Sequence, residues 1–299
     1  MADQTAFPQF KSEESRARFM AAYDAALRDW PVPYEELDLP TRLGPTHAIA
    51  SGPIDGPPLV LLPSFAGTAL VWRLNIAALS QSFRVYAVDV IGQPGKSACV
   101  RRIRNRGEFA GWFVEVLDHL GVERASIVGC SFGGFLALNQ ALETPERVDR
   151  VVLISPAGTF ASQWWKLTYA MRIRAPVLKL ARRLSPRRRK PSLAEPGLRA
   201  MPRDIRWAAL IGVAMTESPR ASVINTSVFS TGQLRRIRAP TLLLIGARET
   251  LYEPTKMLTL ARARMPQLQT ALVPDADHIA AMAQPDDVNA RILGFLARP

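Results

Sequence analysis

The sequence contains few of the residues that cross-link chains or bind metals. It has two cysteines, Cys99 and Cys130, and three histidines, His47, His119 and His278. Their spacing fits neither a disulfide framework nor a Cys/His metal clip, and a zinc site would need several such ligands close together. No apolar run approaches the roughly 20 residues that a membrane-spanning helix requires. The sequence therefore predicts no metal, no cofactor and no membrane span.

Targeting segments, internal repeats and low-complexity linkers are also lacking. Residues 1–18 are polar and do not contain the apolar segment of a secretory signal. The chain has 299 residues, of which 48% are apolar, enough for one large α/β domain or two smaller ones. We therefore expect a globular cytoplasmic protein with a sizeable core.

Acidic residues are scarce in one segment of a chain whose net charge is +12. Residues 159–206 contain 13 Lys or Arg against two acids. The cluster Arg187–Lys190 could bind nucleic acid or an anionic membrane, or could attract acidic substrates. It could instead be a solvated face of this segment. Arginine is common throughout the chain, with 32 Arg against 6 Lys, so we favour the solvated face and expect no nucleic-acid partner.

Short apolar runs alternate with helical patterns along most of the chain. A short apolar run bounded by turn residues is typical of a strand that is buried on both faces. Strands are expected at 37–43, 46–51, 59–62, 84–88, 125–128, 151–154, 241–245 and 270–273. Helices are expected at 13–28, 108–120 (ended by Gly121), 135–143 and from 285 onward. This alternation predicts an α/β fold with a mostly parallel central sheet and helices on both faces.

One segment breaks the alternation. No strand is evident from residue 159 to residue 234, where tryptophans, methionines and arginines are frequent. Open α/β sheets bind ligands beyond the carboxyl ends of their strands, so an insertion at such an end could cover the site. We therefore predict a core domain of residues 1–158 and 235–299, with a helical cap (lid) insertion at 159–234.

The most informative motif is Gly129-Cys130-Ser131-Phe132-Gly133, a G-x-S-x-G sequence between a predicted strand and a predicted helix. A sharp turn at this place lifts the serine oxygen clear of the sheet, and the glycines allow backbones to approach closely. The N-terminus of the helix offers free N–H groups to an oxyanion. The motif predicts Ser131 as a catalytic nucleophile.

A nucleophilic serine needs a general base, and there are three histidines to choose from. His278 follows the last predicted strand, on a loop before the terminal helix. His119 closes a helix, where a solvated or capping role is expected, and His47 lies far upstream. The chain order serine, acid, histidine is typical of sites built on a G-x-S-x-G turn. We therefore predict His278 as the base.

The acid that orients the base should follow a strand between Ser131 and His278. Glu249 lies just beyond the predicted strand 241–245, where a carboxylate could fix the imidazole tautomer and stabilise the imidazolium. Glu253, Asp275 and Asp277 are alternatives, although the two aspartates are so near His278 in sequence that we expect them to shape its loop. We predict Glu249 as the orienting acid.

Together these features resemble the α/β-hydrolase superfamily, and bacterial carboxylesterase-like serine hydrolases in particular, over almost the whole chain. Looser segments that share the resemblance are the Pro63–Gly67 loop with Trp72, Asp89–Gly92, Pro145–Val148, Ile237–Thr241 and Gln284–Leu296. The resemblance implies the α/β-hydrolase fold and cleavage of a carboxylic ester through an acyl-enzyme at Ser131. It also implies an oxyanion hole formed by the backbone N–H groups of Phe132 and Phe65.

The sequence departs from the family pattern at three places. The loop for the second oxyanion donor begins Pro63-Ser64, where many relatives have His-Gly. The acid is Glu249 where Asp is commoner, so its longer reach must be accommodated. Cys130 replaces the more frequent histidine before the nucleophile, and we expect it to be a small packed side chain and not a second nucleophile.

Other functions share some of these features. Gly95–Ser97 resembles the end of a phosphate-binding loop, but Val90 stands where its first glycine is needed and Pro94 lacks a backbone donor. Dehalogenase and epoxide hydrolase chemistry would need an aspartate in place of Ser131. Thioesterase, lactonase, amidase and carbon–carbon bond hydrolase activities remain open, as does a non-catalytic ligand-binding protein on this fold. The tryptophans and methionines of the insertion are typical of an apolar acyl or aryl pocket, although packing in a core explains them equally well; we expect a small ester with an apolar acyl or aryl group as the substrate.

Overall fold

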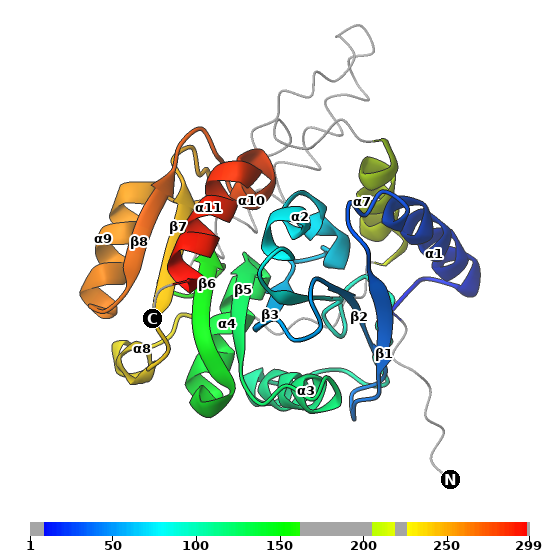
Figure 1. Cartoon of the computed structure of the whole chain (residues 1–299), viewed down its shortest axis with the longest axis horizontal. Helices are drawn as coiled ribbons and strands as arrows, with labels where there is room; N and C mark the ends of the chain where they lie inside the picture. Colours follow the sequence, from blue (N-terminus) through cyan, green and yellow to red (C-terminus); the bar gives the residue numbers. More distant parts are fainter. Residues whose placement is uncertain (1–8, 162–204, 219–225, 298–299) are drawn as a thin grey trace, which may run out of the picture.

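The computed structural model describes residues 9–161, 205–218 and 226–297 (Figure 1). The strands are β1 (Glu35–Leu39), β2 (Thr46–Ser51), β3 (Pro58–Leu62), β4 (Arg84–Val88), β5 (Ala125–Cys130), β6 (Val148–Ile154), β7 (Thr241–Gly246) and β8 (Gln269–Val273). The helices are α1 (Glu13–Leu27), α2 (Ile76–Leu79), α3 (Arg106–His119), α4 (Phe132–Glu143), α7 (Ile205–Glu217), α8 (Thr231–Arg236), α9 (Pro254–Arg264), α10 (Ala280–Ala283) and α11 (Pro285–Leu296). Two short 3-10 helices are η1 (Ala69–Leu74) and η2 (Pro145–Arg147).

The strands of the described residues form one eight-stranded sheet in the order β1-β2-β4-β3-β5-β6-β7-β8 (Figure 1). Strands β3 to β8 pair in parallel, whereas β2 pairs antiparallel with both β1 and β4. The predicted α/β fold with a mostly parallel sheet is confirmed. Because the strands β3 to β8 all run the same way, the loops that follow them meet at one edge of the sheet.

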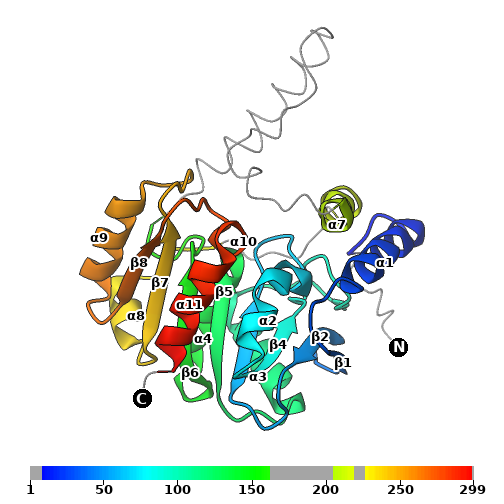
Figure 2. The ribbon, with the colours of Figure 1, turned by 45° about the horizontal axis from the view of Figure 1, so that its top comes forward.

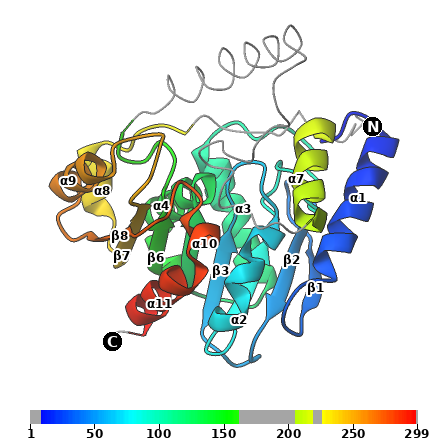
Figure 3. The same ribbon diagram turned by 90° about the horizontal axis from the view of Figure 1, so that it is seen from above.

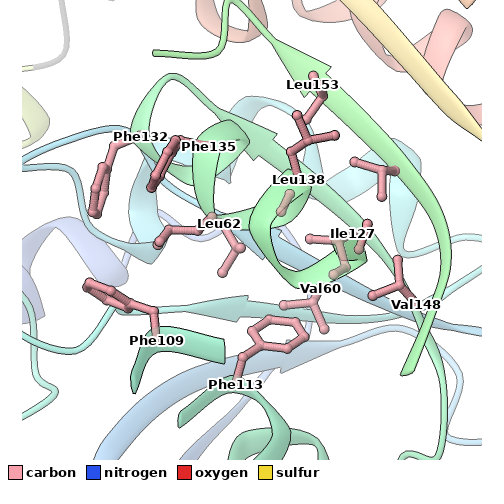
Figure 4. Close-up of a cluster of buried hydrophobic side chains, with 14 of the residues drawn as sticks. Val60, Leu62, Phe109, Phe113, Ile127, Phe132, Phe135, Leu138, Val148 and Leu153 are labelled. Carbon is pink, nitrogen blue, oxygen red and sulfur yellow. The ribbon is translucent and has the colours of Figure 1, made fainter. Parts of the chain in front are cut away.

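Helices cover both faces of the sheet (Figures 2 and 3). Successive residues of a strand point to opposite faces, so β3 contributes Val60 and Leu62 to one core and Leu59 and Leu61 to the other. The first core includes side chains of α3, α4 and α9, and Figure 4 shows Val60 and Leu62 packed among its aromatic rings. The second core includes side chains of α1, α2 and α11.

Helix α3 shows how the sequence sets the ends of an element. It is capped by Asn105, whose side chain accepts a hydrogen bond from the N–H of Glu108 at 3.0 Å. At the other end Gly121 adopts φ 67°, and the N–H of Val122 donates to the carbonyl of Leu117 at 2.9 Å. This pattern is a Schellman motif. The prediction that Gly121 ends this helix is confirmed.

Part of the predicted insertion lies within the described residues. It includes α7, which packs against α1 (Figure 3), and the residues leading into α8, which continues to Arg236. Residues 162–204 and 219–225 lie outside the described residues, so the boundaries of the predicted cap stay a prediction. No helix within the described part of the chain is both long and apolar enough to span a membrane.

Candidate active site

Ser131 is the single residue between β5 and α4. It adopts φ 51° and ψ −109°, a region that costs a non-glycine residue of order 1–3 kcal/mol. The surrounding chain holds it there, because its N–H donates to the carbonyl of Ile154 at 2.9 Å and its carbonyl accepts from the N–H of Ala157 at 3.0 Å. The sharp strand-to-helix turn expected from the motif is therefore present. Helix α4 begins at Phe132, three residues earlier than predicted.

The second glycine of the motif allows β3 and α4 to touch. A Cβ atom at Gly133 would lie 2.2 Å from the carbonyl oxygen of Leu62, the last residue of β3. Any side chain at this position would push α4 away from the sheet, because the atoms that it would meet are backbone atoms of Leu62 and Pro63, which cannot move aside. The close approach keeps Ser131 next to the loop that follows β3.

His278 lies between Ser131 and Glu249. Its Nε2 atom is 3.0 Å from the Oγ atom of Ser131, and its Nδ1 atom is 2.7 Å from Oε2 of Glu249. Ser131 follows β5, Glu249 follows β7 and His278 follows β8, at the edge of the sheet where these parallel strands end. The structure thus brings together the three residues that the sequence singled out as nucleophile, base and acid.

The carboxylate of Glu249 is completely buried and fully hydrogen bonded. One oxygen accepts from the backbone N–H groups of Thr250 at 2.7 Å and Leu251 at 2.9 Å, which leaves the other oxygen for His278. Burial alone would raise the pKa of Glu249, but the hydrogen bond and charge of His278, together with these N–H groups, lower it. An ionised Glu249 makes Nδ1 of His278 a donor, so Nε2 can accept the Ser131 proton.

The other acids near His278 have different partners. Glu253 caps α9 by accepting from the N–H groups at the start of that helix. Asp275 forms an ion pair with Arg248, and Asp277 accepts from the N–H of Ile279 at 3.1 Å. These contacts agree with the expectation that Asp275 and Asp277 shape the loop of His278.

Two aromatic residues supply the backbone N–H groups expected to bind an oxyanion. Phe132 is the first residue of α4, and Phe65 lies on the loop after β3. Their rings meet edge to face with centroids 6.5 Å apart. Within the described part of the chain, neither backbone N–H donates a hydrogen bond. Phe132 is buried, whereas Phe65 is 44% exposed beside it.

Cys130 is buried directly before Ser131. Burial, with a smaller contribution from the charge of Glu249, raises the pKa of its thiol to about 12. A protonated thiol is a poor nucleophile, in agreement with the expectation that Cys130 is a packed side chain. Within residues 9–161, 205–218 and 226–297, no group of three or more His, Cys, Asp or Glu side chains is arranged to hold a metal ion.

A second buried histidine lies outside the site and was not singled out by the sequence. Nδ1 of His47 is 3.0 Å from a carboxylate oxygen of Asp89, and Nε2 is 3.0 Å from a carboxylate oxygen of Glu36. Lys96 forms ion pairs with Glu36 and Asp24. Because both ring nitrogens face carboxylates, this arrangement favours the doubly protonated, positively charged form of His47.

Known proteins resemble this chain along nearly its full length. Residues 57–285 match the family described as "alpha/beta hydrolase fold". Carboxylesterase YbfK of Bacillus subtilis (strain 168) is 36% identical over 306 residues, covering 96% of each chain, and the uncharacterized carboxylesterase nap of the same strain is 34% identical, covering 93% of this chain and 92% of the relative. The crystal structure of naproxen esterase from Bacillus subtilis aligns with a TM-score of 0.81 and 30% identity, covering 96% of this chain and 99% of that one. This chain therefore belongs to the α/β-hydrolase fold family.

Proposed function

We propose that this α/β hydrolase cleaves small-molecule carboxylic esters through an acyl-enzyme on Ser131. The observation that carries the proposal is the contact of His278 with both Ser131 and Glu249 at the carboxyl ends of the strands. The chain is a carboxylesterase-like serine hydrolase by its similarity, over nearly the full length, to the Bacillus carboxylesterases.

The first half of the proposed reaction transfers the acyl group to the enzyme. Oγ of Ser131 attacks the ester carbonyl while its proton passes to Nε2 of His278, and Glu249 stabilises the resulting imidazolium. The carbonyl oxygen becomes an oxyanion that accepts from the backbone N–H groups of Phe132 and Phe65. The C–O bond then breaks, and the alcohol leaves with the proton from His278.

The second half returns the enzyme to its starting state. A water molecule attacks the acyl carbon while His278 takes one of its protons. The oxyanion forms in the same hole, and the bond to Ser131 breaks as His278 returns the proton to Oγ. The carboxylic acid then leaves. The same groups therefore serve both halves, and neither half needs a cofactor.

The aromatic side chains near Ser131 favour an apolar acyl or aryl group on the substrate. Phe65 is 44% exposed and lies against Phe132, and an exposed ring beside a reactive serine offers a surface for another apolar group. We propose a small ester of this kind as the partner, and no nucleic acid. Salt-sensitive retention of the protein on DNA would contradict the second part of this proposal.

Substitution of the nucleophile tests the proposed function directly. We expect Ser131→Ala to lower turnover of p-nitrophenyl esters at least about 1,000-fold and to abolish labelling by a fluorophosphonate, because no oxygen is left to attack. Ser126→Ala is a matched control and should remain active, since Ser126 lies near the start of β5, at the end of the strand away from Ser131. Unchanged turnover by Ser131→Ala would overturn the proposal.

A substrate panel tests the class of bond. We expect alkyl and aryl esters of graded chain length to be cleaved faster than thioesters, lactones and amides with the same acyl groups. A higher kcat/KM for any of those three classes would reassign the activity within serine hydrolases.

A further inference from the structure

A buried tyrosine follows the short segment that holds the carboxylate of Glu249. Tyr252 lies between β7 and α9, three residues after Glu249, and its side chain belongs to the first core. The backbone N–H groups of Thr250 and Leu251, which lie between these two residues, hold one oxygen of the carboxylate. The chain thus brings a phenol into the surroundings of the acid of the proposed site.

A second buried hydroxyl lies at the end of the neighbouring strand. Ser155 follows β6, is completely buried and has φ 43°, a left-handed conformation that is strained for a residue with a Cβ atom. Its N–H donates to the carbonyl of Leu244 in β7 at 2.8 Å. Its turn also holds the nucleophile, because the backbones of Ile154 and Ala157 bond to Ser131. Ser155 is therefore fixed between β7, which leads to the acid, and the turn that supports the nucleophile.

The hydroxyl groups of Tyr252 and Ser155 are both buried without a close partner. Within the described part of the chain, neither oxygen has a partner at the distance and angle of a good hydrogen bond. Buried hydroxyls in this situation are rare in folded proteins, since they lose their hydrogen bonds to water. In enzymes without a substrate, however, catalytic hydrogen bonds are often long and tighten only during the reaction. The position of this pair beside Glu249 favours that explanation.

The electrostatic interactions of the Tyr252 hydroxyl indicate which way it donates. Burial and the charge of Glu249 raise the pKa of Tyr252 well above its usual value, so the phenol stays protonated. The hydrogen-bonding interaction with Ser155 lowers this pKa and that with Glu249 raises it, so Tyr252 accepts from the serine and donates to the carboxylate. Cys130 is the other titratable group that affects Tyr252, and its thiol stays protonated below a pKa of about 12.

The carboxylate of Glu249 can accept one more hydrogen bond, although both of its oxygens already have partners. An ionised carboxylate offers about four lone-pair sites. Three of them face the N–H groups of Thr250 and Leu251 and the ring of His278. A phenol donor at the fourth site restrains the carboxylate from turning away from the imidazole when positive charge develops there.

We propose that Tyr252 is a positioning residue for Glu249, with its hydroxyl donating to the carboxylate and accepting from Ser155. The two hydroxyls tie the acid to the turn that supports Ser131. This inference rests on the proposed function, in which Glu249 orients His278. Tyr252 acts through the acid, and its contribution is largest in the transition state, because a carboxylate that is already held in place needs no reorganisation there.

The substitution Tyr252→Phe removes the hydroxyl and keeps the ring. We expect kcat for an aryl ester to fall about 3- to 10-fold per fluorophosphonate-labelled site, because the carboxylate is held less firmly. The acid limb of kcat/KM should also move up by about half a pH unit, since a carboxylate that has lost a donor attracts the proton on His278 more strongly. KM should change by less than about threefold.

Tyr23→Phe is the matched control. Tyr23 is also a completely buried tyrosine whose hydroxyl has no close partner among the residues that the structure describes. It lies on α1, where the carboxylate that affects it is Asp89 and not the acid of the proposed site. This variant should keep the wild-type kcat per labelled site and the wild-type acid limb, whatever its stability.

A second substitution tests the link to Ser155. Ser155→Ala keeps the Cβ atom, and with it the backbone strain, but removes the other hydroxyl. We expect a smaller loss of kcat, about 2- to 3-fold, with a smaller shift of the acid limb in the same direction. This loss should disappear in the Tyr252→Phe background, because Ser155 acts through Tyr252. The pH profile of Ser155→Ala also provides the test if Tyr252→Phe does not fold.

The outcomes distinguish the two proposals. An unmoved acid limb in Tyr252→Phe, with or without a loss of kcat, or an equal shift in Tyr23→Phe, would overturn the positioning role alone. Losses that add in the double variant would overturn the link between Ser155 and Tyr252. A wild-type protein that neither hydrolyses esters nor reacts with the fluorophosphonate would overturn the proposed function, and the positioning role with it.

Discussion

Glu249 uses its two carboxylate oxygens for different partners, and this division explains how a glutamate fits where an aspartate is commoner. One oxygen is held by the N–H groups of Thr250 and Leu251, and the other contacts His278. The extra methylene group of glutamate is accommodated because the side chain folds back over its own loop. The carboxylate is thereby fixed on both sides.

Two substitutions at Glu249 test this arrangement. We expect Glu249→Gln to lower kcat about 1,000- to 10,000-fold, because the neutral amide neither selects the required tautomer of His278 nor stabilises its charge. Glu249→Asp keeps the charge but cannot reach all three partners at once, so a loss of about 10- to 100-fold is expected. Kinetics with an aryl ester measure both. A mild loss of kcat in Glu249→Gln would show that another acid orients His278. Asp277→Asn would then be the variant to compare.

The residues of the proposed site could be predicted from the sequence, whereas the buried network beside it could not. Ser131 lies in a local motif, and His278 and Glu249 follow strands whose apolar runs are easily recognised, so all three were predicted. The role of His47, which lies outside the site, was not predicted, because its partner Asp89 comes from a loop far away in the chain. Asp89 is opposite His47 only because β2 pairs antiparallel with β4, and neither the pairing nor the register is evident from a single sequence.

At the scale of the elements, errors in the predicted boundaries have local causes. Strand β1 was predicted at 37–43 but ends at Leu39, where Pro40 follows and lacks the N–H group that a longer ladder would use. Helix α4 was predicted from residue 135, since Phe132-Gly133-Gly134 has poor helix propensity. It starts directly after Ser131 because contact with β3 requires glycine there. A proline thus ends β1 locally, whereas a tertiary contact outweighs helix propensity at the start of α4.

Gly111 lies inside helix α3 and Gly121 lies just after its end, and the two glycines differ in backbone conformation. A Cβ atom would meet nothing within 4 Å at Gly111 or at Gly121, but only Gly121 has a positive φ. We expect Gly111→Ala to raise the free energy of unfolding by about 0.5–1 kcal/mol, because alanine favours a helix interior. We expect Gly121→Ala to lower it by about 1 kcal/mol, because alanine is strained in the left-handed region. Urea denaturation measures both, and esterase activity should not change. A destabilised Gly111→Ala variant would contradict this interpretation of α3.

At the scale of the whole molecule, the network of His47 joins helix α1 and the loop after β4 to the strands β1 and β2. It links α1 through Asp24, β1 through Glu36, β2 through His47 itself and the loop after β4 through Asp89 and Lys96. The loop after β4 in turn contacts the Phe65 loop. The charge of His47 is therefore expected to affect the stability of the fold at the end of the sheet that bears Ser131.

The sign of the pH dependence follows from the pKa of His47. Burial alone would lower this pKa, but the hydrogen bond and charge of Asp89 and the hydrogen bond with Glu36 raise it overall, against a smaller opposing effect of Lys96. The folded protein therefore binds the proton more tightly than the unfolded chain. The resulting stability is fully present below the unfolded pKa of about 6.5 and is lost as the pH rises through the folded pKa.

Comparison of the wild type with His47→Gln isolates this contribution, because the two proteins share their other titrating groups. We expect the variant to be less stable by about 3 kcal/mol near pH 6, since a buried carboxylate at Asp89 loses its cation. The difference should shrink as the pH is raised through the raised pKa of His47, above which the wild type has lost the same proton. Urea denaturation across this range gives the free energy of unfolding of each protein. A difference that stays constant or grows with pH would show that His47 is not the cation of this network.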